Sequence, residues 1–182
     1  MKKTLVPVVL VSFLAFFGSC LFTYAVDKPE IKDGMIVFTG ENEPIGLDEL
    51  QSIPESISPV VDKIRGVVWG GQWQYMNTSP SGPITYMVMQ SYNKENGEAT
   101  FIITSSRIIA SKGGKGVPPV KFVVQGKIDD WLVITQPPKN FKEYDRKYKM
   151  QLGQLIKKGE IELNYDFSPK FSATLTPVLN LP

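Results

Sequence analysis

Large apolar side chains fall on every second residue through much of the chain. The clearest example is the run VVWGGQWQY, residues 67–75, where Trp69, Trp73 and Tyr75 share one face of an extended strand. The opposite face carries mainly small or polar side chains. This two-residue period predicts a half-buried β-strand with Trp69 and Trp73 pointing inward.

The same alternation returns in later segments that are separated by turns rich in Gly, Asn, Asp and Pro. These segments are residues 84–89, 99–103, 120–124, 131–134, 148–152, 161–165 and 171–175. A shorter apolar piece, residues 108–110, extends or follows the strand at 99–103. About eight short strands at this spacing predict a mainly β fold, an antiparallel up-and-down β-barrel, with a β-sandwich as the alternative.

The part before the strands has a different pattern. Residues 26–46 are polar and turn-rich around one short strand candidate, residues 35–38, which predicts a linker with an edge strand. Apolar residues then recur at three- and four-residue spacings up to Ile64, interrupted by Pro54 and Pro59. We therefore expect one or two short helices before the barrel, within a single domain of residues 47–182.

The N-terminus has the pattern of an export signal. Lys2 and Lys3 precede an uncharged, largely apolar stretch, residues 4–26, with small residues before the expected cleavage after Ala25. Residues 1–25 are thus interpreted as a signal peptide, and the protein as exported to the periplasm, the cell envelope or the medium.

Two alternatives to this cleavage remain open. Cys20 follows Gly18 and Ser19, as in a lipoprotein processing site, where the cysteine becomes the lipidated N-terminus. The stretch is also long enough to stay as an anchor, since about 20 apolar residues span a bilayer. Membrane association is expected only in these two cases.

Charge and composition exclude several classes of function. Removing Lys2 and Lys3 from the 20 basic residues leaves 18, equal to the 18 acidic ones, so we expect no nucleic-acid partner. The chain has no histidine, which excludes Ser-His-Asp catalysis and histidine-based zinc sites. Cys20 is the one cysteine, so the exported domain has no disulfide. No cofactor is expected.

The start of the first long strand resembles a known family. The residues that carry the resemblance are Gly66, Trp69, Gly70 and Trp73. After a short helix and before successive hairpins, they are similar to the Gly-x-Trp signature of the lipocalin-like or calycin barrels. Two residues rather than one separate the glycine from the tryptophan, and Arg107 and Arg146 are the candidates for the family's basic residue that packs on it. The resemblance implies a barrel that often carries a small hydrophobic molecule, although some members have no known ligand.

Five aromatic side chains are candidates for a ligand pocket in such a barrel: Trp69, Trp73, Tyr75, Tyr86 and Trp131. Aromatic rings supply large apolar faces, and Tyr and Trp add a polar tip. Packing in the core explains the same residues.

Paired carboxylates offer an alternative, enzymatic function. Glu160 and Glu162 alternate with apolar residues, which places both carboxyl groups on one face about 6.6 Å apart along a strand. Such a pair suits glycan hydrolysis, but a solvated outer strand face explains it too. Asp129 and Asp130 are candidates for calcium binding or acid catalysis, or simply residues of a hairpin turn.

The glycine-rich segment at residues 111–119 is expected to be a surface loop. It lacks the glycine spacing and the following Ser or Thr of a phosphate-binding loop. The sequence therefore predicts an exported, non-enzymatic protein that binds a small hydrophobic or aromatic ligand or an envelope component. The alternatives are the carboxylate-dependent glycan-active enzyme and an interaction module that docks through this loop.

Overall fold

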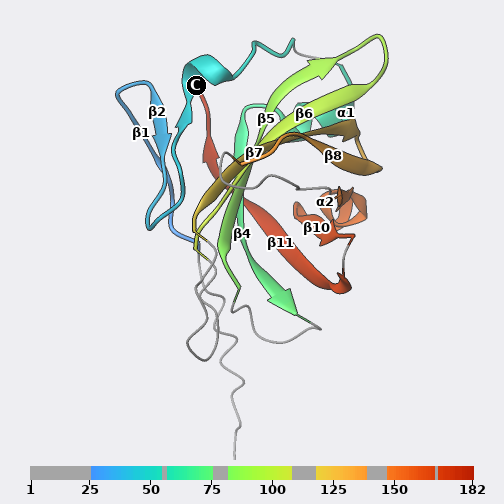
Figure 1. Cartoon of the computed structure of the whole chain (residues 1–182). Coiled ribbons are helices and arrows are strands. Elements are labelled where there is room, and N and C mark those ends of the chain that lie inside the picture. The colour runs from blue at the N-terminus through green and yellow to red at the C-terminus, as the bar shows by residue number, and fades with distance from the viewer. Residues whose placement is uncertain (1–25, 55–56, 76–81, 108–117, 139–146, 167) are drawn as a thin grey trace, which may run out of the picture.

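Strand β4 (Val67–Tyr75) belongs to a closed barrel of antiparallel strands in the order β10-β11-β4-β5-β6-β7-β8-β9 (Figure 1). A computed structural model of the chain describes residues 26–54, 57–75, 82–107, 118–138, 147–166 and 168–182. The other strands of the barrel are β5 (Ile84–Asn93), β6 (Glu98–Ser105), β7 (Val120–Lys127), β8 (Trp131–Gln136), β9 (Lys147–Gln151), β10 (Ile161–Tyr165) and β11 (Ser168–Asn180).

The predicted fold class is confirmed, because each predicted strand from 67–75 onwards corresponds to one strand of the barrel. The Asn96-Gly97 turn joins β5 to β6, and Gly97 has φ of +75°, a left-handed conformation that favours glycine. The piece at 108–110 and most of the loop at 111–119 lie outside the described residues.

The predicted short helices are also present. They are the 3-10 helix η1 (Leu47–Glu49) and the α-helix α1 (Pro59–Ile64). Pro59 begins α1 rather than interrupting it, because proline suits the first helical position, and the Ser58 Oγ accepts a hydrogen bond from the Val61 amide at 3.2 Å. A further helix, α2 (Gly153–Lys158), was not predicted. In the described ranges, no helix has the length and apolar character needed to cross a bilayer.

The N-terminal residues form a small sheet on the outside of the barrel. Its strands are β1 (Glu30–Lys32), β2 (Met35–Val37) and β3 (Ile45–Gly46), of which the sequence predicted only β2. Figure 1 shows this sheet on the left of the barrel. Ile36, Phe38 and Ile45 pack there against outward side chains of β4 to β7, and together they form an outer core.

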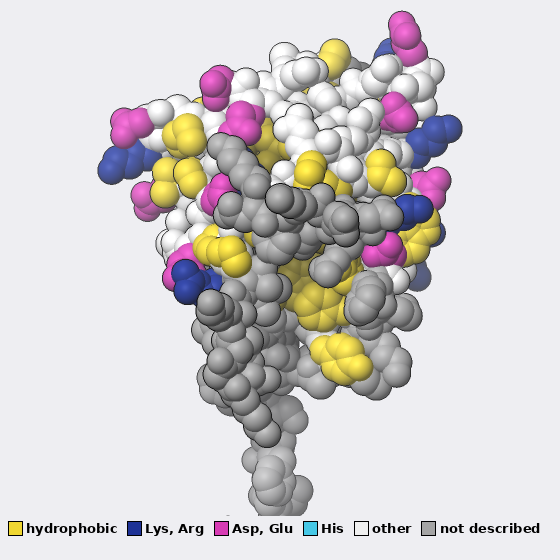
Figure 2. Space-filling view, in the orientation of Figure 1, with side chains coloured by type: hydrophobic (Ala, Val, Ile, Leu, Met, Phe, Trp, Pro, Cys, Tyr) yellow, Lys and Arg dark blue, Asp and Glu magenta, His cyan; other side chains and the backbone are white. Residues whose placement is uncertain are grey.

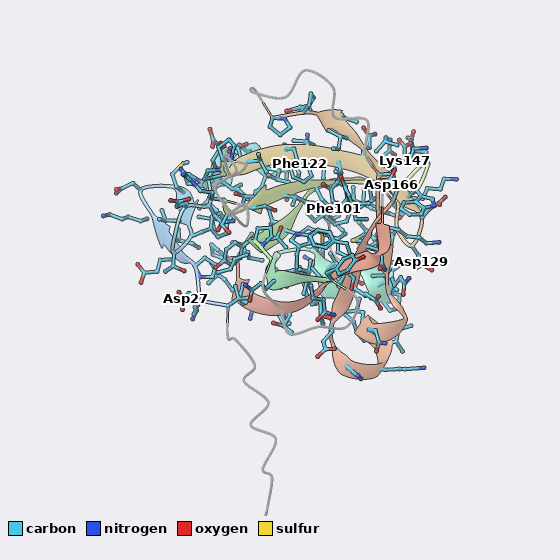
Figure 3. The ribbon with its side chains drawn as sticks, turned by 60° about the horizontal axis from the view of Figure 1, so that its bottom comes forward. Asp27, Phe101, Phe122, Asp129, Lys147 and Asp166 are labelled. Carbon is cyan, nitrogen blue, oxygen red and sulfur yellow. The ribbon has the colours of Figure 1, made fainter. Side chains whose placement is uncertain are left out.

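A second, larger core fills the inside of the barrel. Trp69 and Trp73 point inward as predicted, and both are almost fully buried. Phe101 and Phe122 point inward from β6 and β7 (Figure 3). Val61 and Ile64 of α1 belong to the same core and cover the end of the barrel at which β4 begins. We call this the upper end, and the end at which β4 finishes the lower end.

Candidate functional site

A groove lies at the upper end of the barrel, between η1 with the residues that follow it and the two residues after β11, Leu181 and Pro182. Its volume is about 690 Å³, which falls in the range of small-molecule sites. Its apolar lining comes from Leu47, Leu50, Ile53, Pro54, Met89 and Leu181. Gln51, Ser52 and Arg65 add polar groups. We call this feature the upper groove.

A bulge in β5 holds one wall of the upper groove. The pairing of β5 with β6 shifts register between Met89 and Ser91, which sets Gln90 apart from the regular ladder. The Gln90 carbonyl accepts the Gln51 amide at 2.9 Å, and the Gln90 side-chain amide donates to the Glu49 carbonyl at 3.0 Å. The backbone carbonyl and the side-chain amide of Gln90 thus attach the end of η1 and the residues after it to the rim of the barrel.

The opposite wall is held by the segment after α1. Gly66 ends the helix with φ of +65°, and its carbonyl accepts the Leu181 amide at 2.7 Å. Trp69 lies just inside this rim, where its indole Nε1 donates to the Ile64 carbonyl at 3.4 Å. Arg65, which lines the upper groove, donates from Nε to the Asp62 carboxylate at 3.3 Å. The exposed surface of the groove is therefore more polar than apolar, although apolar side chains form part of its walls.

Glu49 attaches η1 to the barrel wall. Its carboxylate accepts hydrogen bonds from the Lys121 ammonium on β7 and from the Gly46 amide, each at 2.8 Å. Partial burial opposes the charge of this carboxylate, but these two hydrogen bonds and the positive charge of Lys121 prevail. As a result, the pKa of Glu49 is below its ordinary value of 4.5. The ion pair thereby helps to position Leu47 and Leu50 in the upper groove.

The lower end of the barrel contains a cluster of aromatic rings from five strands, which we call the ring cluster. Its members are Trp73, Phe122, Tyr148, Tyr165 and Phe171. The rings of Trp73 and Phe171 are stacked, with centroids 4.9 Å apart and planes 8° apart. Phe171 is half-buried, whereas the other four rings are buried. The ring cluster therefore fills the lower end with packed side chains.

The aromatic ligand-binding candidates from the sequence do not meet in one place. Trp69 lies at the upper end of the inner core and Trp73 in the ring cluster, while Tyr75, at the end of β4, is 52% exposed. Tyr86 lies in the outer core, where its hydroxyl donates to the Asp27 carbonyl at 3.0 Å. Trp131 is 41% exposed at the start of β8. Of the five, only Trp69 lies beside the rim of the upper groove.

The acidic candidates lie on the surface of the fold. Glu162 points away from the inner core on β10, since its neighbours Ile161 and Leu163 are buried, and Glu160 precedes that strand. Asp129 and Asp130 form the turn between β7 and β8, where Asp129 has φ of +68° and the Asp130 carboxylate accepts the Trp131 amide at 2.7 Å. Among the described residues, no acidic or cysteine side chains group in a way that could hold a metal ion.

The remaining candidates can be placed only in part. Arg107 forms an ion pair with Glu41 at 3.0 Å on the surface of the protein. Cys20 and Arg146 lie outside the described residues.

Comparisons of the chain with protein-family models, with curated proteins and with solved structures give no match. The closed barrel of eight antiparallel strands is compatible with the lipocalin-like resemblance of the sequence.

Sequence reasoning did not find the upper groove. In the sequence, Leu47, Leu50 and Ile53 belong to a helical stripe, and Met89 fits a core gap as well as a pocket. The signal that could have pointed to the groove is Pro54, because a proline inside a helical pattern ends the helix and leaves apolar residues on an irregular segment.

Proposed function

We propose that this chain is an exported, non-enzymatic protein that binds a small hydrophobic ligand bearing a polar group in the upper groove. The observation that carries this proposal is the groove itself, with its volume of about 690 Å³ and its lining of apolar side chains together with a larger exposed polar surface. An apolar body would lie against Leu50, Ile53 and Met89, and a polar group would face Gln51, Ser52 or Arg65.

The site differs from the cavity that the lipocalin-like resemblance implies. In that family the ligand enters the barrel, but here the inner core is formed by buried side chains from every strand of the barrel. Among the described residues, the upper groove reaches this core at Met89 and at Ile53, which packs against it. Binding beside the barrel rim therefore suits the described residues better than binding in the middle of the barrel.

Export is the second part of the proposal. Its support is the charged start at Lys2 and Lys3 followed by the uncharged residues 4–26. The absence of histidine from the chain supports a binding role over the common forms of acid-base and nucleophilic catalysis.

Energy transfer to an amphipathic dye tests the binding site. The dye 1-anilinonaphthalene-8-sulfonate should bind the protein and accept excitation energy from Trp69, which lies beside the groove rim. Ile53→Ser removes apolar surface from the groove wall and should weaken dye binding about tenfold, because the lost burial is worth roughly 1–2 kcal/mol.

The chain offers a matched control for this variant. Ile156→Ser changes the same type of residue on α2, away from the groove, where the side chain is 71% exposed. It should leave dye binding unchanged. Equal weakening by both variants, or no binding by the wild type, would contradict the proposed site.

A further inference from the structure

Arg65 is the one ionised side chain among the described residues that line the upper groove. Its guanidinium keeps its positive charge throughout the pH range of folded proteins, and it can only donate hydrogen bonds. Gln51 and Ser52 add further N–H and O–H donors to the same lining. None of the described lining side chains is acidic, so the polar side chains of the groove suit a ligand group that carries negative charge.

Two carboxylates close to the groove belong to ion pairs, and neither residue is part of the lining. The Glu49 carboxylate accepts hydrogen bonds from Lys121 and from the Gly46 amide. The Asp62 carboxylate accepts from Arg65 Nε at 3.3 Å, and the side chains of Arg65 and Asp62 are 25% and 33% exposed. Ion pairs between partly exposed groups are weak, because water screens them, so an acid group held against the groove wall can compete for the guanidinium.

The backbone fixes Arg65 at the rim of the groove. Its amide donates to the Val61 carbonyl at 2.9 Å at the end of α1. The next residue, Gly66, accepts the Leu181 amide and so attaches this rim to the end of the barrel. A positive charge therefore lies at a fixed position beside the apolar lining, an arrangement that matches a ligand with an acidic head and an apolar body.

The wider surface does not select the charge of a ligand. On the face of the molecule shown in Figure 2, acidic and basic side chains are interspersed, and neither kind forms a continuous patch among the coloured side chains. Long-range attraction on this face thus favours neither sign of charge. Selection for an anion must come from direct contact with Arg65.

We propose that the ligand of the upper groove is an anionic amphiphile, whose acid group binds the guanidinium of Arg65 while its apolar body lies against Leu50, Ile53 and Met89. The planar fork of a guanidinium suits a carboxylate, which accepts two parallel hydrogen bonds from it. This inference rests on ligand binding in the upper groove and is independent of export.

A pair of dyes that differ only in an acid group tests the inference. N-phenyl-1-naphthylamine has the same aromatic body as 1-anilinonaphthalene-8-sulfonate but lacks the sulfonate. In fluorescence titrations, Arg65→Gln should weaken binding of the sulfonated dye about tenfold, because it removes a charge-assisted hydrogen bond. Binding of the neutral dye should change by no more than about twofold, which also shows that the variant keeps a folded groove.

Arg107→Gln is the matched control. It removes the same charge from the surface ion pair with Glu41, and Arg107 does not line the groove. This variant should change binding of neither dye. The proposal is wrong if Arg65→Gln affects the two dyes equally, or if Arg107→Gln weakens the sulfonated dye as much as Arg65→Gln does.

Octanoate and octanamide test the wild-type protein, so this measurement remains decisive if Arg65→Gln does not fold. The two molecules have the same carbon chain and a planar polar group, but only octanoate is charged at neutral pH. Octanoate should displace the neutral dye at a lower concentration than octanamide. Displacement at the same concentration, or more readily by octanamide, overturns the proposal.

Failure of this inference can be distinguished from failure of the proposed binding site. If Ile53→Ser weakens both dyes but Arg65→Gln does not discriminate between them, the groove remains the site and only the acidic ligand class is wrong. If the wild type binds neither dye, the groove itself is not a binding site.

Discussion

Gly70 and Gly71 allow close contacts on both faces of β4. A methyl group on Gly71 would lie against the Thr174 carbonyl oxygen and 2.8 Å from Leu175 Cδ2, inside the barrel. A methyl group on Gly70 would point outward and come 3.0 Å from the Tyr86 ring. The first contact is with backbone, which cannot move without separating β4 from β11, whereas the second involves a side chain.

We predict that Gly71→Ala destabilises the protein by about 1–3 kcal/mol, because overpacking forces the β4–β11 pair apart. Gly70→Ala should cost less, since its contacts, with the Tyr86 ring and with Val178 Cγ1 at 3.1 Å, are with side chains that need to shift by only a few tenths of an ångström. The free energy of unfolding from urea denaturation measures both effects.

Gly153→Ala is the control for these two variants. Nothing lies within 4 Å of a methyl group at this position in α2, so the variant should be neutral or slightly stabilising. A Gly71→Ala protein as stable as Gly153→Ala would show that the β4–β11 ladder is looser than the structure indicates.

Tyr86 shows why the sequence alone could not predict which side chains of β5 point into the barrel. Ile84, Tyr86 and Val88 alternate with Thr85, Met87 and Met89 along β5, and both sets are largely buried. When both faces of a strand are apolar, the two-residue period does not show which face points into the barrel. The outward position of Tyr86 depends on its cover, the N-terminal sheet, which lies more than 40 residues earlier in the chain.

At the scale of elements, the N-terminal sheet covers the outer core and shields it from water. Ile36 of β2 is fully buried, whereas its neighbour Val37 is 40% exposed. Ile36→Ala should destabilise the protein by about 2–5 kcal/mol. Val37→Ala, the matched control, should change stability by no more than about 0.5 kcal/mol. If urea denaturation gave similar losses of unfolding free energy for the two variants, this result would contradict the burial of β2 against the barrel.

The ion pair between η1 and β7 gives the protein a specific sensitivity to acid. Because the folded-state pKa of Glu49 is lowered, the stabilisation from its charged form is fully present above about pH 4.5. This stabilisation disappears as the pH falls through the lowered pKa. The melting temperature of the wild type should therefore exceed that of Glu49→Gln near neutral pH, and the difference should narrow below pH 4.5.

Asp48→Asn controls for the change in net charge, because it removes an exposed carboxylate from the same turn. The difference in melting temperature between the wild type and Asp48→Asn should not narrow as the pH falls below 4.5. A Glu49→Gln protein whose melting temperature differs from the wild type by the same amount at every pH would exclude this role for the ion pair.

The elements differ in how far the sequence could predict them. The strands of the barrel follow from alternation and turn residues, which are local signals. Strand β1 has three residues and β3 has two, which is too few for an alternation of apolar and polar residues to be recognised. The upper groove depends on the Gln90 bulge and on the contact between Leu181 and Gly66, which join distant parts of the chain. Such contacts leave no periodic signal in one sequence.

At the scale of the whole molecule, neighbouring strands of the barrel differ in how many of their residues are paired. β6 pairs with β7 at every position from Glu98 to Ser105. By contrast, β8 pairs with β7 at three positions, one of them across a register shift, and with β9 at three positions. The outward side chains Trp131 and Val133 of β8 are exposed, whereas outward side chains of β5 and β6 lie under the N-terminal sheet.

We predict that β8 is the first strand of the barrel to open. Local opening costs less free energy where the backbone has few paired positions and little buried apolar surface around it. Backbone amides of β8 should therefore exchange with deuterium faster than those of β6, at a pH where the protein is fully folded. Opening of β8 exposes Leu132 and the inner core, and it leaves the upper groove intact because no residue of β8 lines that groove. Equal protection of β6 and β8 would instead show that the barrel unfolds as one unit.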